Sequence, residues 1–259
     1  MNDFTGKIAL ITGGGRGVGA EIGALLAKGG AHVILDYCRD AKQAETTLAR
    51  ILSDGGSAEL IRANVTDQDA VERLFTAVGE QHGRLDVLVN NAASGELSYL
   101  DGVTAKGLAR AAATNWWGPM WCALQAAPLM PPGAAIVNIS AHGAAFALPG
   151  YGGLGPSKAA LESLTRYLAA ELGPRRIRAN AASGGVLESE IASRLPHSPE
   201  LFASISQLTP LGRLGTQREM AQVAVFLASS AASWINGQTV VVDGGLLAAP
   251  LPSPRPEPL

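Results

Sequence analysis

Short apolar runs of strand length alternate with longer stretches of helical periodicity along nearly the whole chain. The apolar runs occur at residues 8–11, 33–35, 58–61, 87–89, 135–139, 177–181 and 239–242. Amphipathic stretches bounded by glycine, proline or capping residues separate them, at residues 19–28, 41–54, 67–81, 104–129, 157–172 and 217–229. Continuous apolar runs are typical of parallel strands that are buried on both faces. The alternation therefore predicts an α/β fold, a Rossmann-type doubly wound parallel sheet in a single domain.

The extent of this domain follows from length and composition. A chain of 259 residues that is 47% hydrophobic can bury one large core. The pattern is interrupted by one long irregular insertion between Gly184 and Gly215. Five prolines fall within residues 248–259, so we expect a disordered tail there. The domain itself is expected to cover residues 1–247.

Charge and cysteine content argue against several kinds of partner. The net charge is -2 without a cluster of Lys and Arg, which does not favour nucleic-acid binding. Every apolar stretch is shorter than the ~20 residues of a membrane-spanning helix, and the run at 8–11 is too brief for a signal segment. Cys38 and Cys122 stand alone, without metal-ligand spacing. We therefore expect a cytoplasmic protein with no metal, membrane or nucleic-acid partner.

Glycines are concentrated between the first strand and the first helix, in the run from Thr12 to Gly19. Backbone amides that begin a helix can bind a pyrophosphate, because they are free donors at the positive end of the helix dipole. A side chain at Gly13 or Gly17 would hold the backbone away from the phosphates, and one at Gly19 would obstruct helix packing. The run therefore predicts a dinucleotide site whose contacts include Arg16 and Val18.

The choice between NADPH and NADH is expected at the end of the second strand. Asp36 would favour NAD if its side chain pointed at the ribose, because a carboxylate accepts from the 2′-hydroxyl and repels a 2′-phosphate. Arg16 and Arg39 could instead bind that phosphate. Since Tyr37 rather than Asp36 is expected to face the ribose, NADPH is favoured over NADH. Arg39 could also be an ordinary solvated charge.

A tyrosine and a lysine are the strongest candidates for chemistry. Tyr151 stands seven residues before Lys158, and Leu154 stands four before it. A phenol near an ammonium group can donate a proton or stabilise an oxyanion beside a nicotinamide ring. Seven residues could place both side chains on one helical face about 10 Å apart. Alternatively, Tyr151 lies on a loop before the helix, because Pro156 is suited to a first helical turn.

These motifs together resemble the short-chain dehydrogenase/reductase superfamily over roughly residues 6 to 245. Besides the glycine run, the resemblance rests on Asn64 with Val65, on residues 90–93, on Asn115, and on residues 136–140, 157–161, 178–181 and 242–245. It implies an adenine wall at Asn64 and Val65 and further cofactor contacts at Asn91 and Ala92. It also implies that Asn115 holds a water in a proton relay and that Lys158 binds the nicotinamide ribose.

The chain departs from the usual family pattern at two catalytic positions. Ala141 stands where the usual serine is expected, and Leu154 stands at the usual tyrosine position. A tyrosine seven residues before the lysine resembles the NADPH-dependent enoyl-acyl-carrier-protein reductase III type. That resemblance implies that Tyr151 serves as the catalytic phenol. It also implies that backbone near Gly185 and Val186 holds the carboxamide, with an added contact from Ser189.

Other features have less specific interpretations. The resemblance implies a substrate lid at about residues 186–215 and a homotetramer formed through the helices that carry Trp117 and Leu161. A lone histidine, His142, lies beside the expected site and could be an acid or base, but we interpret it as a loop hydrogen-bonding residue.

The leading hypothesis is an enoyl reductase that reduces the trans-2 double bond of an enoyl thioester with NADPH. The thioester would be carried on acyl carrier protein or coenzyme A. One alternative is a short-chain ketoreductase or alcohol dehydrogenase in specialised-metabolite biosynthesis, although the missing serine counts against it. Another is a regulatory or scaffold protein that senses NADPH without turnover. Retention of Asn115, Tyr151 and Lys158 argues against that last alternative.

Overall fold

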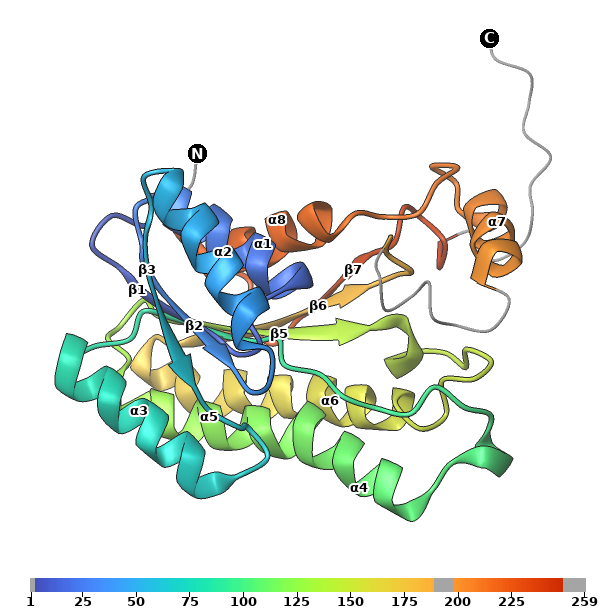
Figure 1. Cartoon of the computed structure of the whole chain (residues 1–259), viewed down its shortest axis with the longest axis horizontal. Helices are drawn as coiled ribbons and strands as arrows, with labels where there is room; N and C mark the ends of the chain where they lie inside the picture. The colour runs from blue at the N-terminus through green and yellow to red at the C-terminus, as the bar shows by residue number, and fades with distance from the viewer. Residues whose placement is uncertain (1–2, 189–197, 249–259) are drawn as a thin grey trace, which may run out of the picture.

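A computed structural model describes residues 3–188 and 198–248. Its centre is a sheet of seven parallel strands in the order β3-β2-β1-β4-β5-β6-β7 (Figure 1). The strands are β1 (Ile8–Ile11), β2 (His32–Tyr37), β3 (Ser57–Arg62), β4 (Val87–Asn90), β5 (Ala135–Ala141), β6 (Arg178–Gly184) and β7 (Thr239–Val242). The doubly wound sheet predicted from the apolar runs is confirmed, and the strand order reverses between β1 and β4. Ligands bind such sheets beyond the carboxyl ends of the strands at this reversal.

Helices cover both faces of the sheet, with α1, α2 and α8 above and α3, α5 and α6 below in the view of Figure 1. Their bounds are α1 (Gly17–Lys28), α2 (Ala41–Ser53), α3 (Gln68–His82), α4 (Ala105–Ala112), α5 (Gly118–Ala126), α6 (Gly155–Leu172), α7 (Ser198–Leu208) and α8 (Gln217–Ala228). Successive residues of β1 enter opposite cores, since Ala9 and Ile11 pack with the α1 and α8 side and Leu10 with the α3 and α5 side. Burial on both faces explains the continuous apolar strands.

The stretch predicted as one helix over 104–129 is continuous but not uniform. Between α4 and α5, residues Ala113–Trp117 take π-helical geometry. Such single-turn bulges are frequent at functional sites. This one contains Asn115, which is completely buried.

The insertion that we expected to be irregular contains helix α7. The expectation was wrong for Ser198–Leu208, because the succession of Ser198, Pro199 and Glu200 is a helix-start signal that was overlooked. Residues 189–197, including Ser189 and part of the expected lid, lie outside the described residues.

At the far end of the chain, Ala248 belongs to a turn, with its amide donating to the Gly245 carbonyl at 3.0 Å. Residues 249–259 of the expected tail lie outside the described residues, so the disordered tail stays a prediction. Within residues 3–188 and 198–248, no helix combines the length and apolar character needed to cross a membrane.

Candidate active site

The glycine turn is fastened to the loop that follows β4. The Thr12 hydroxyl oxygen accepts hydrogen bonds from the amides of Asn91 and Ala92, at 3.0 and 3.1 Å. The Asn91 side-chain amide donates back to the carbonyls of Thr12 and Gly13, each at 3.0 Å. A Cβ atom at Gly13 would lie 3.0 Å from the Ala92 backbone, and one at Gly19 would overlap the Asn91 side chain. The tight turn therefore requires glycine at both positions.

The turn leads into α1 with its first amides available. Arg16 at the N-cap is extended, and its side chain makes no capping hydrogen bond with the described residues. Gly17 begins the helix with φ +60°, a conformation that side chains rarely adopt. An anion placed here would meet the amide groups of the first turn, formed by Gly17, Val18 and Gly19. The residues therefore fit a dinucleotide pyrophosphate.

Asp36, the candidate ribose ligand of NAD, is turned into the protein. Its two carboxylate oxygens accept from the Ala63 amide at 3.0 Å and the Gly13 amide at 3.3 Å. Burial raises the pKa of this carboxyl to about 7, opposed by the two hydrogen bonds. Tyr37, the next residue, is only half-buried and Arg39 is exposed. The side chain of Asp36 thus supports the glycine turn and β3 instead of facing a ribose.

The expected adenine wall follows the end of β3. Val65 is buried, whereas Asn64 is exposed and accepts from the amide and hydroxyl of Thr66 at 3.2 and 2.9 Å. The Asn64 side chain therefore closes a local turn. Its contact with the adenine stays a prediction.

Tyr151 lies on the loop that precedes α6, which agrees with the second of the two placements considered from sequence. Its carbonyl accepts from the amides of Leu154 and Gly155, at 3.0 and 2.8 Å. Helix α6 then begins at Gly155, with Pro156 in its first turn. The Tyr151 ring lies so close to Gly143 that a Cβ atom there would overlap it. Burial raises the pKa of the Tyr151 phenol to about 12, so the hydroxyl is protonated at neutral pH.

Lys158 is buried in the first turns of α6, under the end of β5. Its ammonium group donates to the Ile139 carbonyl at 2.7 Å. Burial lowers the pKa of Lys158 to about 8, and the nearby Glu162 carboxylate opposes this shift. Glu162 in turn accepts from the Ser140 hydroxyl at 2.6 Å. Ser140 therefore faces α6 and does not replace the missing serine of the site.

The two unusual positions are filled by apolar groups. Ala141 is the last residue of β5 and pairs with Gly184 of β6. The Leu154 side chain packs against Gly95, where an added Cβ atom would overlap it. Neither side chain carries a donor or an acceptor. Tyr151 is therefore the candidate acid in this loop.

Asn115 connects three parts of the site. Its side-chain nitrogen donates to the Ser94 carbonyl at 2.7 Å and to the Ser157 hydroxyl at 2.9 Å, and its side-chain oxygen accepts from the Ser94 amide at 3.1 Å. The Asn115 side chain thus holds the loop after β4 against α6. Its contact on α6, Ser157, is the residue directly before Lys158. A role in holding a water stays a prediction.

Sequence reasoning underestimated His142. It is 2% exposed, and neither ring nitrogen has a hydrogen-bond partner among the described residues. Its Nε2 atom lies 3.3 Å from an Asp243 carboxylate oxygen. Burial lowers the pKa of the imidazole, whereas Asp243 acts in the opposite direction. The expected role as a loop hydrogen-bonding residue is therefore wrong.

The position of His142 brings it into the candidate site. A Cβ atom at Gly185 would lie 3.1 Å from the imidazole Cε1 atom, so the ring lies beside the segment expected to hold the carboxamide. Gly185 itself donates to the Val242 carbonyl at 2.9 Å, and the Val186 carbonyl accepts from Gly215 at 3.3 Å. The sequence did contain a signal for this role of His142, because the residue follows directly after β5, at the carboxyl edge of the sheet.

A cavity of about 150 Å³ lies beside this edge, under α7. Its lining combines apolar with charged side chains and includes Val186, Leu187, Ile205, Leu211, Leu246, Arg213, Glu219 and Asp243.

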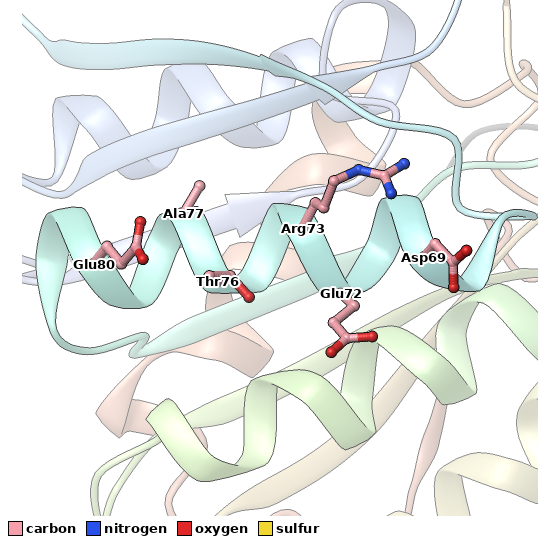
Figure 2. A pocket seen from close by; sticks show the side chains of 6 residues that line it. All are labelled: Asp69, Glu72, Arg73, Thr76, Ala77 and Glu80. Atoms are coloured by element: carbon pink, nitrogen blue, oxygen red, sulfur yellow. The ribbon is translucent and has the colours of Figure 1, made fainter.

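A second hollow runs along the outer face of α3 (Figure 2). It is lined by Asp69, Glu72, Arg73, Thr76, Ala77 and Glu80. These side chains make a solvated, largely charged helix face. We therefore place the candidate active site at the carboxyl edge instead.

Comparisons with known proteins agree with this geometry. The sequence model of a family described as enoyl-(acyl carrier protein) reductase matches residues 13–247. The chain is 36% identical over 249 residues to 1-cyclohexenylcarbonyl-CoA reductase of Streptomyces collinus, covering 93% of this chain and 86% of the relative. It is 34% identical over 249 residues to the rhamnolipids biosynthesis 3-oxoacyl-[acyl-carrier-protein] reductase of Pseudomonas aeruginosa, covering 93% of this chain and 96% of that protein.

Solved structures show the same architecture. A short-chain dehydrogenase/reductase from Serratia marcescens superposes with a TM-score of 0.88 at 32% identity, covering 94% of this chain and 98% of the other. This fold implies a nicotinamide cofactor, and the glycine turn and the buried lysine fit one. The chain belongs to the short-chain dehydrogenase/reductase superfamily and is an oxidoreductase.

Proposed function

We propose that the protein reduces the trans-2 double bond of an enoyl thioester, with NADPH as the reductant. The observation that carries the proposal is the combination of a half-buried Tyr151, whose phenol stays protonated, with apolar groups at Ala141 and Leu154. Reduction of a ketone makes an alkoxide that must take a proton at once. Reduction of an enoyl thioester makes a delocalised enolate that needs mainly one hydrogen bond.

The site residues have separate tasks in this reaction. Bound NADPH would supply a hydride to the β-carbon. The Tyr151 hydroxyl, which stays protonated at neutral pH, donates a hydrogen bond to the thioester oxygen, where negative charge develops. Lys158 supports that charge electrostatically and orients the cofactor ribose. The enolate then takes a proton from water at its α-carbon, which completes the reduction.

The names of two relatives favour two different classes of substrate. The name 1-cyclohexenylcarbonyl-CoA describes a thioester whose carbonyl is conjugated to a ring double bond, and this supports an unsaturated thioester here. The relative named as a 3-oxoacyl reductase favours a second candidate function, reduction of a 3-ketoacyl thioester. In that case Tyr151 would protonate the alkoxide directly.

NADPH is proposed over NADH because the carboxylate of Asp36 is already used by the amides of Gly13 and Ala63. This leaves the ribose end of the site to Tyr37 and to the cations Arg16 and Arg39. Guanidinium groups bind phosphate by charge-assisted hydrogen bonds. A 2′-phosphate therefore finds partners here, and a repelling carboxylate is turned away from it.

A homotetramer is proposed from the surface of α5, α6 and the π-helical segment. Trp117, Leu124 and Tyr167 are large side chains exposed by 38%, 59% and 65%. Clusters of exposed apolar side chains often mark subunit interfaces. Light scattering at micromolar concentration should give about four times the chain mass of 26.6 kDa. A mass near that of one chain would contradict the proposal.

A substrate panel tests the reaction. Wild-type protein is mixed with NADPH and with either crotonyl or acetoacetyl thioesters of coenzyme A, and oxidation is followed at 340 nm. We expect rapid turnover of the enoyl compound and slow turnover of the ketone. Ala141→Ser should not improve enoyl reduction. Fast ketone reduction that depends on Tyr151, without enoyl reduction, would favour the second candidate function.

A further inference from the structure

Two histidines and a glutamate from three separate elements converge at the edge of the sheet formed by β2 and β3. His32 is the first residue of β2, Glu59 lies within β3 and His82 is the last residue of α3. They gather near the amino ends of the strands, whereas the candidate active site lies beyond the carboxyl ends. The enoyl reductase proposal uses none of the three.

The three side chains point their polar atoms at one another. His82 Nε2 lies 2.7 Å from Glu59 Oε1, and His32 Nε2 lies 3.4 Å from the same oxygen. One ligand atom from each residue can be chosen so that all lie within 4.8 Å of one another. Tetrahedral zinc with bonds of about 2.0–2.2 Å holds its ligand atoms about 3.2–3.6 Å apart. The observed arrangement therefore needs only small side-chain movements to surround a cation.

Neighbouring groups hold the outer atoms of this cluster. His32 Nδ1 lies 2.7 Å from the hydroxyl of Ser57, its register partner on β3. The Gln81 side chain donates to Glu59 Oε2 at 2.8 Å. Such contacts fix the orientation of metal ligands from outside, and they leave His32 Nε2 and Glu59 Oε1 directed inward.

The exposure of the cluster also suits a cation. The side chains of His32, Glu59 and His82 are exposed by 27%, 24% and 12%. They are thus partly shielded, yet solvent can still deliver an ion to them.

We propose that His32, Glu59 and His82 bind one divalent transition-metal cation of the zinc type, with the remaining coordination position open to water. Two imidazoles and one carboxylate suit zinc better than magnesium or calcium, which prefer oxygen ligands. Because the ligands come from β2, β3 and α3, the ion would tie this sheet edge to its covering helix. It would stabilise the fold without taking part in hydride transfer.

Calorimetric titration of the untagged, EDTA-treated full chain with zinc chloride tests this site directly. We expect one zinc per chain. At a free zinc concentration about a hundredfold above the dissociation constant, Tm should rise by about 5 °C or more. Magnesium chloride at the same concentration should leave Tm unchanged.

Two variants separate ligation from folding. His82→Gln keeps an amide that can donate to Glu59 but removes the imidazole ligand, so zinc affinity should fall at least tenfold while the metal-free protein stays folded. Glu80→Gln removes an exposed carboxylate near the end of the same helix and should bind zinc like the wild type. The site would be refuted if the wild type bound no zinc, or if His82→Gln showed the same affinity and Tm shift as the wild type.

Discussion

The Tyr151 ring lies directly against the backbone of Gly143, which leaves no room for a side chain at that glycine. The contact joins the end of β5 to the loop before α6. It also holds the Tyr151 ring in place. A second contact comes from Gly155, the first residue of α6, where an added Cβ atom would lie 3.6 Å from the ring.

Gly143→Ala should therefore displace the phenol. We expect turnover of an enoyl thioester to fall by about tenfold or more, because a displacement of about 1 Å can be costly to a positioned group. Gly150→Ala provides no control, since Gly150 has φ +73° and would be strained itself. Ala144→Ser, at the next residue of the same turn, is a milder comparison and should retain most activity. Equal activity of Gly143→Ala and wild type would contradict the role of this contact.

Removal of the phenolic hydroxyl should affect chemistry more than cofactor binding. Tyr151→Phe is expected to lower the turnover number for an enoyl thioester by about 10²-fold or more, the scale for losing a positioned acid or oxyanion donor. NADPH affinity, measured by fluorescence titration, should change little. Tyr167→Phe alters an exposed tyrosine on α6 and serves as the matched control. Wild-type turnover in Tyr151→Phe would show that the hydroxyl has no catalytic task.

Lys158 should produce a decline in activity at alkaline pH. Its pKa of about 8 means that the ammonium group is charged below this pH and loses its proton above it. We expect kcat/KM to fall as the pH rises through about 8 and Lys158→Ala to lose more activity than Tyr151→Phe. Because Glu162 raises the lysine pKa, Glu162→Gln should move the midpoint to lower pH. If the midpoint in Glu162→Gln were unchanged, titration of Lys158 would not be the cause of the decline in activity.

Cofactor preference should depend on Arg39. Arg39→Ala is expected to raise the Michaelis constant for NADPH more than that for NADH, because only NADPH carries the 2′-phosphate. Lys42→Ala removes another cation near this end of β2 and should affect the two cofactors less unequally. If Asp36→Ala instead converted a strong NADH preference into NADPH use, the assignment of Asp36 to a supporting role would be wrong.

Much of the fold could be predicted because its signals are local. Apolar runs buried on both faces of a parallel sheet have a recognisable length, and the glycine turn needs a short string of residues that are adjacent in the chain. The α7 helix had a local start signal as well, which was overlooked. The order of Tyr151, Leu154 and Lys158 likewise predicted an unusual reductase site, since spacing along the chain is itself the signal.

The tertiary structure decided those features of the site that depend on contacts between residues far apart in the chain. Asp36 could face a ribose or the interior, and only the positions of Gly13 and Ala63 directed it inward. His142 became part of the site because β5 and β7 end at the same edge of the sheet, which brings Asp243 beside it. The cluster of His32, Glu59 and His82 has no motif, since its hydrogen-bonded residues are 27 and 23 positions apart. Residue pattern determined which strands and helices form, whereas strand register and helix packing determined which side chains meet, because those contacts join residues far apart in the chain.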